Sequence, residues 1–330
     1  MQSKKYIIIL SVLLAAFLRS NGQDVAFSQF YANPLYLNPA LAGAKLCPRL
    51  TLNFRNQWPS VQNGYVTYSA TYDDHLESIS GGIGLIANST VAAGGAYNIF
   101  SGSGLYSYRL QASRSLVLNA AFKVGYTQYR LNWEKFVFGD QINVNTGVLK
   151  PTSELAPSRP NYGDLDLSAG FLAGYKESLY FGVAVDHLNK PEMSFYGNNT
   201  LRMDYRLTIH AGALFDFVQG MEGEDLRNFS LSPNVVYLQQ GKFHQLNVGM
   251  SVNMYPLVAG LWYRNNIENS DAMIVLLGFQ QKQFKVGYSF DYTISRFGVQ
   301  SGGAHEFSLA YIFNAPRKNF HIRELKCPSF

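Results

Sequence analysis

Short segments of alternating apolar and polar residues make up most of the chain. Residues 284–293, for example, place Phe, Val, Tyr, Phe and Tyr on one side of a strand and Lys, Gly, Ser, Asp and Thr on the other. Strand side chains point alternately to two faces, so this segment has one apolar and one polar face. Such an apolar face forms the core of a soluble sandwich or meets lipid in a membrane barrel, where the polar face lines the lumen.

About fourteen segments of this kind follow one another. We expect strands at 49–57, 65–73, 81–91, 97–111, 116–130, 164–176, 179–188, 201–217, 229–239, 243–254, 257–266, 272–281, 284–293 and 303–313. The pattern predicts an all-β fold, an up-and-down antiparallel transmembrane β-barrel.

The connections between these strands alternate in length. The long ones at 131–163, 189–200 and 294–302 fall on one side of the barrel, whereas several on the other side are tight turns. Long extracellular loops and short periplasmic turns are typical of outer-membrane barrels, which places both ends of the barrel in the periplasm. The connection 218–228 is the exception, because it is long for a periplasmic turn.

Residues 1–22 resemble a secretory signal peptide. Lys4 and Lys5 precede an apolar stretch at 6–18, and small residues stand before Gln23. The alternative is an uncleaved anchor, but a helix of about 13 apolar residues is shorter than the ~20 needed to span a bilayer. We therefore expect an exported protein of a Gram-negative bacterium, located in the outer membrane.

Residues 23–46 do not alternate and are rich in Asn, Pro and Ala. We expect an ordered, plug-like segment inside or across the periplasmic mouth, followed by the barrel at 47–314 and a basic periplasmic tail at 315–330. Residues 272–279 are apolar on both faces, which indicates that their inner face packs against something inside the barrel. The N-terminal segment is the nearest candidate.

Composition agrees with a barrel. Charged residues make up 15%, aromatic residues 15%, and the mean hydropathy is only −0.07, as expected for aromatic girdles around a polar lumen. The formal net charge of +5 arises at the two ends. Residues 1–22 hold three cations and no acid, and the tail holds four cations and one acid, so the remainder is close to neutral. This distribution gives no support for a nucleic-acid partner.

Several motifs resemble those of a known family. They are FSQFYANPLYLNPALAG at 27–43, RNQWP at 55–59, YSATYD at 68–73, GYSFDYT at 287–293 and GAHEFSLAY at 303–311. In this order they resemble the PorP/SprF family, outer-membrane proteins of type IX secretion and gliding motility in Bacteroidota. The motif residues that we single out are Phe27, Gln29, Tyr31, Asn38, Pro39, Gly43, Arg55, Asn56, Gln57 and Trp58.

The resemblance implies a barrel that lies in outer-membrane lipid and serves the type IX system. Members of the family associate with the periplasmic ring and peptidoglycan-binding components, or with the C-terminal domain of a secreted adhesin. The sequence does not choose between these two roles. The resemblance does not extend to the tail.

We find no set of residues arranged for catalysis. The six histidines show no metal-ligand spacing, and the dinucleotide and nucleophile-elbow motifs are incomplete. We therefore expect no enzyme activity, no metal and no cofactor. Lys123, His210, Lys285, Asp291 and Glu306 are expected to face the lumen. Charges there are usually paired structural groups, and the alternative is a role in partner or ion passage.

Two cysteines, Cys47 and Cys327, flank the barrel, and a disulfide between them is possible if both ends meet in the periplasm. The sequence leaves this pairing open.

The expected function is that of an attachment point. The loop 131–163 offers Trp133, Phe136, Phe138 and Tyr162 as contact residues, and the tail offers cations. Two alternatives stay open: a transporter of hydrophobic molecules resembling the FadL class, and a barrel enzyme acting on lipid.

Overall fold

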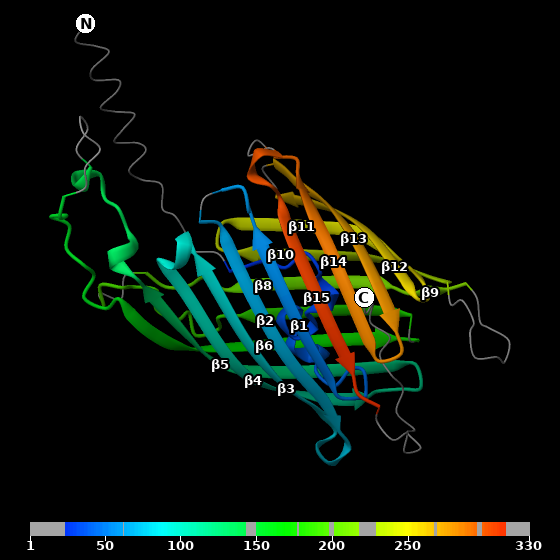
Figure 1. Ribbon diagram of the computed structural model, residues 1–330. Coiled ribbons are helices and arrows are strands. Elements are labelled where there is room, and N and C mark those ends of the chain that lie inside the picture. Colours follow the sequence, from blue (N-terminus) through cyan, green and yellow to red (C-terminus); the bar gives the residue numbers. More distant parts are fainter. Residues whose placement is uncertain are drawn as a thin grey trace, which may run out of the picture.

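The computed structural model describes residues 24–61, 63–142, 150–176, 178–197, 201–217, 229–266, 269–295 and 299–314. The described chain forms one large antiparallel sheet that curves around a set of short helices (Figure 1). Residues 1–22 and the tail 315–330, including Cys327, lie outside the described residues, as does the connection 218–228. No helix of the described part has the length and apolar character needed to cross a membrane.

Neighbouring strands pair in sequence order. Their bounds are β1 Arg49–Gln57, β2 Tyr65–Leu76, β3 Gly81–Ala92, β4 Tyr97–Gln111, β5 Leu116–Leu131, β6 Asn161–Tyr175, β7 Leu179–Asp186, β8 Arg206–Ala213, β9 Phe215–Asp216, β10 Phe229–Gln240, β11 Phe243–Met254, β12 Leu257–Asn266, β13 Asn269–Gln281, β14 Phe284–Thr293 and β15 Ala304–Ile312. Pairing of β1 with β15, and of β10 with both β8 and β11, closes the sheet into a barrel. Both β8 and β9 pair with β10 and are pieces of one strand, so the barrel has the fourteen strands expected from the sequence.

Most strand positions agree with the alternation pattern. The strand expected at 201–217 is the main difference, because regular pairing begins only at Arg206 and is interrupted at Leu214. β6 begins at Asn161, earlier than the pattern indicated, since residues 161–163 pair with the end of β5. There the rings of Tyr129 and Tyr162 stack at 5.0 Å, and such cross-strand aromatic pairs stabilise a sheet.

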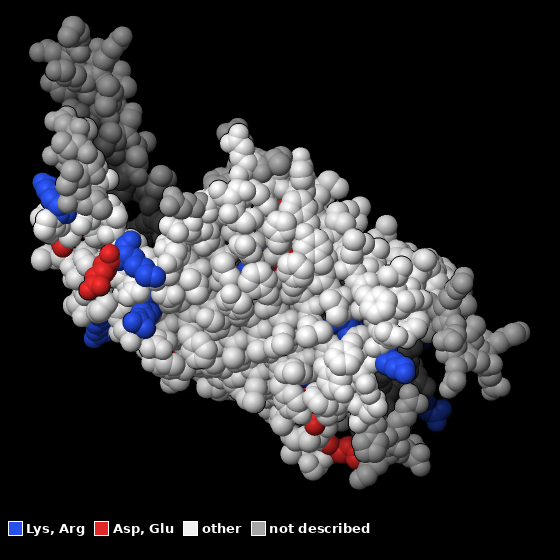
Figure 2. Space-filling view, in the orientation of Figure 1, with Lys and Arg blue, Asp and Glu red and all other residues white. Residues whose placement is uncertain are grey.

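Side chains alternate between the two faces of the barrel wall as expected. In β14, Phe284, Val286 and Tyr292 are exposed on the outer face, whereas Lys285 and Asp291 are buried inside. Figure 2 shows a broad outer surface without charged side chains, with Lys, Arg, Asp and Glu gathered near the two ends. This arrangement suits a hydrocarbon layer around the barrel, where exposed charge is costly.

The N-terminal segment lies inside the barrel. It forms three short helices, η1 (Phe30–Ala32), α2 (Pro34–Leu37) and η2 (Pro39–Leu41), where η denotes a 3-10 helix. Further 3-10 turns occur in the connections: η3 (Glu77–Ile79), η4 (Ala93–Gly95), η5 (Trp133–Lys135), η6 (Gly139–Gln141) and η7 (Val299–Ser301). Nearly every side chain from Phe27 to Ala44 is buried.

The apolar inner face of β13 packs on this segment, as the sequence suggested. Ile274 is fully buried in one apolar cluster with Phe30, Tyr31 and Leu37, and Trp262 of β12 joins them. The rings of Phe30 and Trp262 meet edge to face at 5.6 Å. The barrel therefore has a protein-like apolar core where the N-terminal segment crosses its middle.

The two faces of the wall should respond differently to charge. Val124 of β5 is exposed on the outer face, and Thr127 of the same strand lines a cavity of the lumen. We expect Val124→Arg to lower the free energy of unfolding by about 2–4 kcal/mol if it lies near mid-bilayer, and Thr127→Arg to lower it much less. Urea unfolding in lipid vesicles measures both. Equal losses would contradict the assignment of the two faces.

Candidate docking site in the barrel lumen

The middle of the N-terminal segment is fixed to the wall by Asn38. Its side-chain amide donates to the carbonyl oxygen of Phe171 at 3.0 Å and lies 3.1 Å from His210 Nε2, while its oxygen accepts from Ala40 N–H at 2.9 Å. Gly170 of β6 makes this approach possible, because a Cβ there would lie 2.3 Å from Asn38 Oδ1. The Asn-Pro step thus ties the segment to β6 and β8.

A buried ionic cluster holds the start of the segment. Arg55 of β1 donates to Asp291 and to Glu306, each at 3.0 Å, and to the Ser28 hydroxyl at 2.7 Å. The backbone N–H groups of Ser28 and Gln29 donate to the Glu306 carboxylate at 2.8 and 3.1 Å. All five residues are at most 2% exposed. We call them the Arg55 cluster.

Arg264 of β12 extends the Arg55 cluster toward the end of the barrel that carries the long connections. Its guanidinium donates to Asp291 at 2.9 Å and to Asp271 at 2.5 Å. Each carboxylate here meets at least one guanidinium, as a buried charge requires. These charges therefore join the plug to β1, β12, β14 and β15.

A second ionic cluster holds the first described residue. The Asp24 carboxylate lies 2.7 Å from His187 Nε2 and 3.2 Å from Arg206 Nη1. Arg206 also pairs with Asp186 at 2.8 Å, and Asp186 pairs with Lys123 at 2.6 Å. These residues, which we call the Asp24 cluster, connect the N-terminal segment with β5, β7 and β8. Asp24 N–H adds a hydrogen bond to Gln240 at 2.9 Å.

The charges around His187 keep it protonated. Burial alone would lower the pKa of His187, but the carboxylates of Asp24 and Asp166 outweigh it and raise the pKa to about 10. Burial likewise opposes ionisation of Asp24, yet His187 and Arg206 lower its pKa to about 2. The pair is therefore ionic across the ordinary pH range.

Contacts at its two ends show how far the N-terminal segment reaches. Gly43, next to the start of β1, contacts Asp73 at the end of the barrel with tight turns. Asp24 lies beside the end of β7 and the start of β8, near the long connections. The segment runs along the lumen from one end to the other, further than a cap over one mouth would reach.

A cavity of about 680 Å³ remains at the end with the long connections. We call it the vestibule. Its floor includes Val25, Ala26, Phe27 and Tyr36 of the N-terminal segment. Its walls combine aromatic and small polar side chains, namely Trp58, Tyr65, Tyr97, Tyr129, Thr67, Asn88, Thr90, Ser101, Ser103, Thr127, Gln245 and Asn266.

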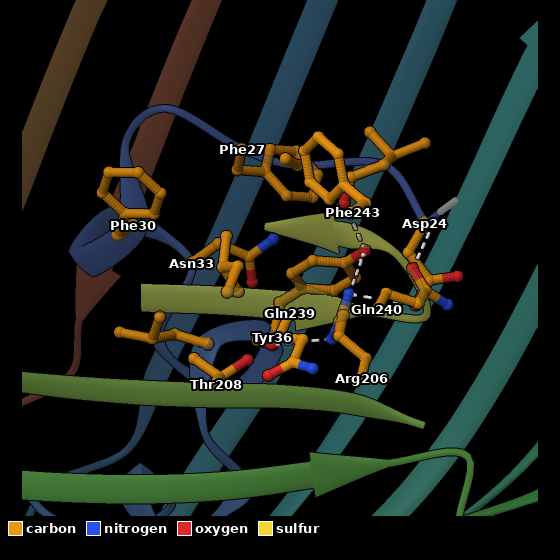
Figure 3. Close-up of a pocket in the computed structure, with 14 residues that line it drawn as sticks. Asp24, Phe27, Phe30, Asn33, Tyr36, Arg206, Thr208, Gln239, Gln240 and Phe243 are labelled. Atoms are coloured by element: carbon orange, nitrogen blue, oxygen red, sulfur yellow. Dashed lines mark hydrogen bonds and ion pairs between the residues drawn. The ribbon is translucent and has the colours of Figure 1, made fainter. Parts of the chain in front are cut away.

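A small side pocket of about 40 Å³ adjoins the vestibule beneath Phe243. In Figure 3, Phe27, Phe30 and Phe243 line its apolar part, and Tyr36, Arg206 and Asp24 converge on its polar side. Arg206 donates to the Tyr36 hydroxyl at 2.8 Å, and that hydroxyl donates to the Val25 carbonyl at 2.6 Å. The pocket is a gap in the packing between plug and wall, too small for an organic ligand.

The connections around the vestibule expose apolar side chains. Trp133, Phe136 and Phe138 form one aromatic group in the β5–β6 connection, and Tyr162 packs edge to face on Phe195 at 5.0 Å. Leu155 in the same connection is 85% exposed. Thus the aromatic residues singled out from the sequence in 131–163 lie at the vestibule end of the barrel.

The motif residues have different surroundings. Phe27, Gln29, Tyr31, Asn38, Pro39 and Gly43 are buried in the lumen, as is Arg55. Gln57 and Trp58 line the vestibule. Asn56 shares the outer face of β1 with Leu50 and Leu52 and takes no part in the lumen.

The charged residues expected in the lumen all lie there. Lys123, His210, Lys285, Asp291 and Glu306 are at most 7% exposed. Cys47 is half-buried, and Cys327 lies outside the described residues, so their disulfide stays a prediction. Within the described ranges, no three His, Cys, Asp or Glu side chains are grouped to hold a metal ion.

Sequence reasoning missed most of the Asp24 cluster. Asp186, His187 and Arg206 stand near the ends of expected strands, where they resemble solvated turn residues. Strand register could have revealed the pair of Asp186 and Arg206, since the antiparallel pairing of β7 with β8 places these two residues opposite each other. The partners of Asp24 could not be predicted in this way, because Asp24 lies in an irregular segment that has no strand register.

Removal of Arg55 should loosen the plug. Arg55→Met leaves Asp291 and Glu306 buried with fewer partners, so we expect a loss of about 3–5 kcal/mol in the free energy of unfolding. The control is Arg159→Met, since Arg159 is 55% exposed and lies 3.9 Å from Glu192, and it should cost about 1 kcal/mol or less. Denaturant titration tests the difference, and a similar small loss in both variants would refute the structural role.

The contribution of His187 should depend on pH. Its pKa is higher in the folded protein than the ordinary value of 6.5, so its stabilisation is complete below about pH 6.5 and disappears as pH rises through about 10. We expect the stability advantage of the wild type over His187→Gln to shrink over that range. Unfolding midpoints at a series of pH values measure it. In an Asp24→Asn background the advantage should be smaller throughout, and a pH-independent advantage would contradict the ionic pair.

Solved outer-membrane proteins resemble the barrel at low identity. The CymD monoaromatic hydrocarbon channel is 12% identical, with 89% of this chain and 96% of that chain covered and a TM-score of 0.48. Omp33 of Acinetobacter baumannii is 9% identical, with 82% and 100% covered and a TM-score of 0.43. The KdgM porin is 8% identical, with 81% and 99% covered and a TM-score of 0.38. A comparison with curated proteins gives no match.

The comparison with protein families is decisive. The model described as "Type IX secretion system membrane protein PorP/SprF" matches residues 19–311. That span includes the plug, the Arg55 cluster, the vestibule and nearly the whole barrel, and it agrees with the motifs noted in the sequence. The chain belongs to the PorP/SprF family of type IX secretion system membrane proteins and forms an outer-membrane β-barrel.

Proposed function

We propose that the protein is an attachment barrel of the type IX secretion system, which holds a secreted cargo protein at the cell surface, connects to periplasmic components, or does both. The observation that carries this proposal is the plugged lumen. Residues 24–46 pass along it, and two buried ionic clusters fix them to the wall. A barrel built in this way is suited to hold partners at its ends.

The two ends differ in what they offer to a partner. The vestibule end presents exposed apolar residues in long connections, as surfaces that bind proteins do. The opposite end carries the start of β1 and the end of β15, from which the basic tail 315–330 continues. We propose that the vestibule end faces the cell exterior, and that the tail meets an acidic or wall-bound partner in the periplasm.

No specific observation favours either of the two alternatives, a transporter of hydrophobic molecules or an enzyme that acts on lipid. A transporter of hydrophobic molecules needs an apolar route, but the apolar side pocket measures about 40 Å³ and the Arg55 cluster lies in the lumen. A lipid-modifying enzyme needs a nucleophile and a base at one rim. We propose a protein without enzymatic activity and without metal or cofactor.

Deletion of the gene should abolish surface display of at least one type IX cargo protein and leave uptake of small solutes unchanged. The physical reason is that a barrel with a fixed plug does not carry solutes, so its loss leaves solute uptake unchanged, whereas the cargo loses its attachment point. Quantitative proteomics of the cell surface and uptake of a labelled hydrophobic nutrient measure the two effects. Normal cargo display combined with impaired uptake would support the transporter instead.

A further inference from the structure

We propose that the vestibule receives an extended, weakly charged polypeptide segment of the cargo, while the surrounding connections contact the folded part of the same cargo. This inference rests on the proposed function and names the place where the cargo binds. The occupant is a protein segment, and the argument for it comes from four features of the barrel end: a fixed floor, lining charges that are already paired with one another, a wall of polar and aromatic side chains with its volume, and an apolar rim.

The floor of the vestibule is a fixed part of the structure. Phe27 and Tyr36 contribute to it, and their rings meet edge to face at 5.0 Å. The Arg55 cluster and the Asp24 cluster hold this part of the segment to the wall on two sides. A molecule that enters from the long-connection end therefore meets a floor, and the vestibule suits binding better than passage.

The charges that line the vestibule are already paired with one another. Arg206 and Lys123 share Asp186, and Arg264 pairs with Asp271. Since these groups satisfy each other, they leave little net charge to select an ionic ligand. The occupant should accordingly carry few charges.

The wall of β3, β4 and β5 offers hydrogen-bonding groups of the kind that an extended backbone needs. Ser101, Ser103 and Thr127 line it from adjacent strands, and Ser101 is the direct partner of Thr127 in the pairing. Asn88 donates to the Ser101 hydroxyl at 3.3 Å, and its own amide oxygen is buried without a partner. Backbone N–H and C=O groups that leave water must find such partners.

Aromatic side chains stand among these polar groups. Tyr97 and Tyr129 lie on the same wall, and Trp58 and Tyr65 meet edge to face at 6.0 Å where β1 turns into β2. Tyr and Trp provide rigid contact area together with a polar atom, which is why protein-binding sites are rich in them. The cavity volume of about 680 Å³ lies within the range of roughly 300–1,000 Å³ typical of ligand pockets, enough for a short stretch of chain.

Aromatic and amide groups in the vestibule could bind a saccharide as well as a polypeptide. The rim of the vestibule favours the polypeptide. Val137, Leu155 and Leu201 are more than half exposed in the β5–β6 and β7–β8 connections. Residues of β6 before Ala169 pair with β5 on one edge, and on the other edge the connection after β7 meets them, where Leu188 N–H donates to the Leu167 carbonyl oxygen at 2.8 Å (Figure 1, green). Exposed aliphatic side chains in connections outside the membrane-spanning strands favour a protein surface over a sugar.

Photocrosslinking in living cells tests the site. The probe is p-benzoylphenylalanine, introduced at Ser101 in the vestibule, at Phe100 on the outer face of the same strand, or at Val137 on the rim. The detected partner is the cargo protein that the deletion strain fails to display. We expect crosslinks from positions 101 and 137 and none from position 100. Crosslinks from the rim alone, or from position 100 as strongly as from 101, would overturn the proposal.

Filling the vestibule gives an independent test. Ser101→Trp places a large ring in the cavity, whereas Phe100→Trp places the same ring on the outer face, where Phe100 is already exposed. We expect Ser101→Trp to lower the amount of cargo retained at the surface roughly tenfold, as loss of a central contact does, and Phe100→Trp to retain it. Heat-modifiable migration in gel electrophoresis serves as the control that both variants assemble into barrels. If Ser101→Trp does not assemble, Thr127→Trp is tested in its place.

The outcomes separate this inference from the proposed function. Cargo display that depends on the gene but is unaffected by an assembled vestibule-filling variant refutes the vestibule and leaves the attachment role intact. Cargo display that is unaffected by deletion refutes both. Loss of display in the filling variant together with a crosslink from position 101 supports the site.

Discussion

The closed barrel wall is the constraint on which the rest of this structure depends. In lipid, every backbone N–H and C=O group must find a partner within the protein, and only helices and closed barrels achieve this. Here the pairings of β1 with β15 and of β10 with β11 complete the ring. Closure by fourteen strands leaves a lumen wider than the wall side chains can fill, and the N-terminal segment packs into it.

The filling of the lumen combines two kinds of interaction. Around the middle, Tyr31, Leu37, Trp262 and Ile274 form an apolar core like that of a soluble protein. Toward the vestibule, charged groups replace apolar ones, and each buried carboxylate of the two clusters is matched by Arg, Lys or His. Buried ion pairs add little stability over apolar packing, but they are intolerant of displacement because an unpaired charge is costly. They therefore fix the position of the plug.

This position divides the barrel into two functional ends. One end is occupied by the junction between the plug and β1, where Gly43 has φ of +66° and approaches β2 and β3 closely. The other end keeps the vestibule and the exposed apolar connections. The attachment role that we propose would use such asymmetry, since partners on the two sides of a membrane differ.

The sequence by itself determined the barrel, its strand number and the facing of most residues. Period-two alternation has a direct physical cause, because one face meets hydrocarbon and the other the lumen. The same alternation puts Lys285, Asp291 and Glu306 on the inner face of the strands, where they are buried, and it was less accurate for the strand expected at 201–217, where Leu214 interrupts the pairing. The motifs also identified the family. Only the tertiary structure decided which charges meet: Asp24 pairs with His187 and Arg206 over a separation of more than 160 residues. The vestibule likewise depends on how far the irregular N-terminal segment reaches along the lumen, and that distance is set by packing, for which local sequence carries no periodic signal.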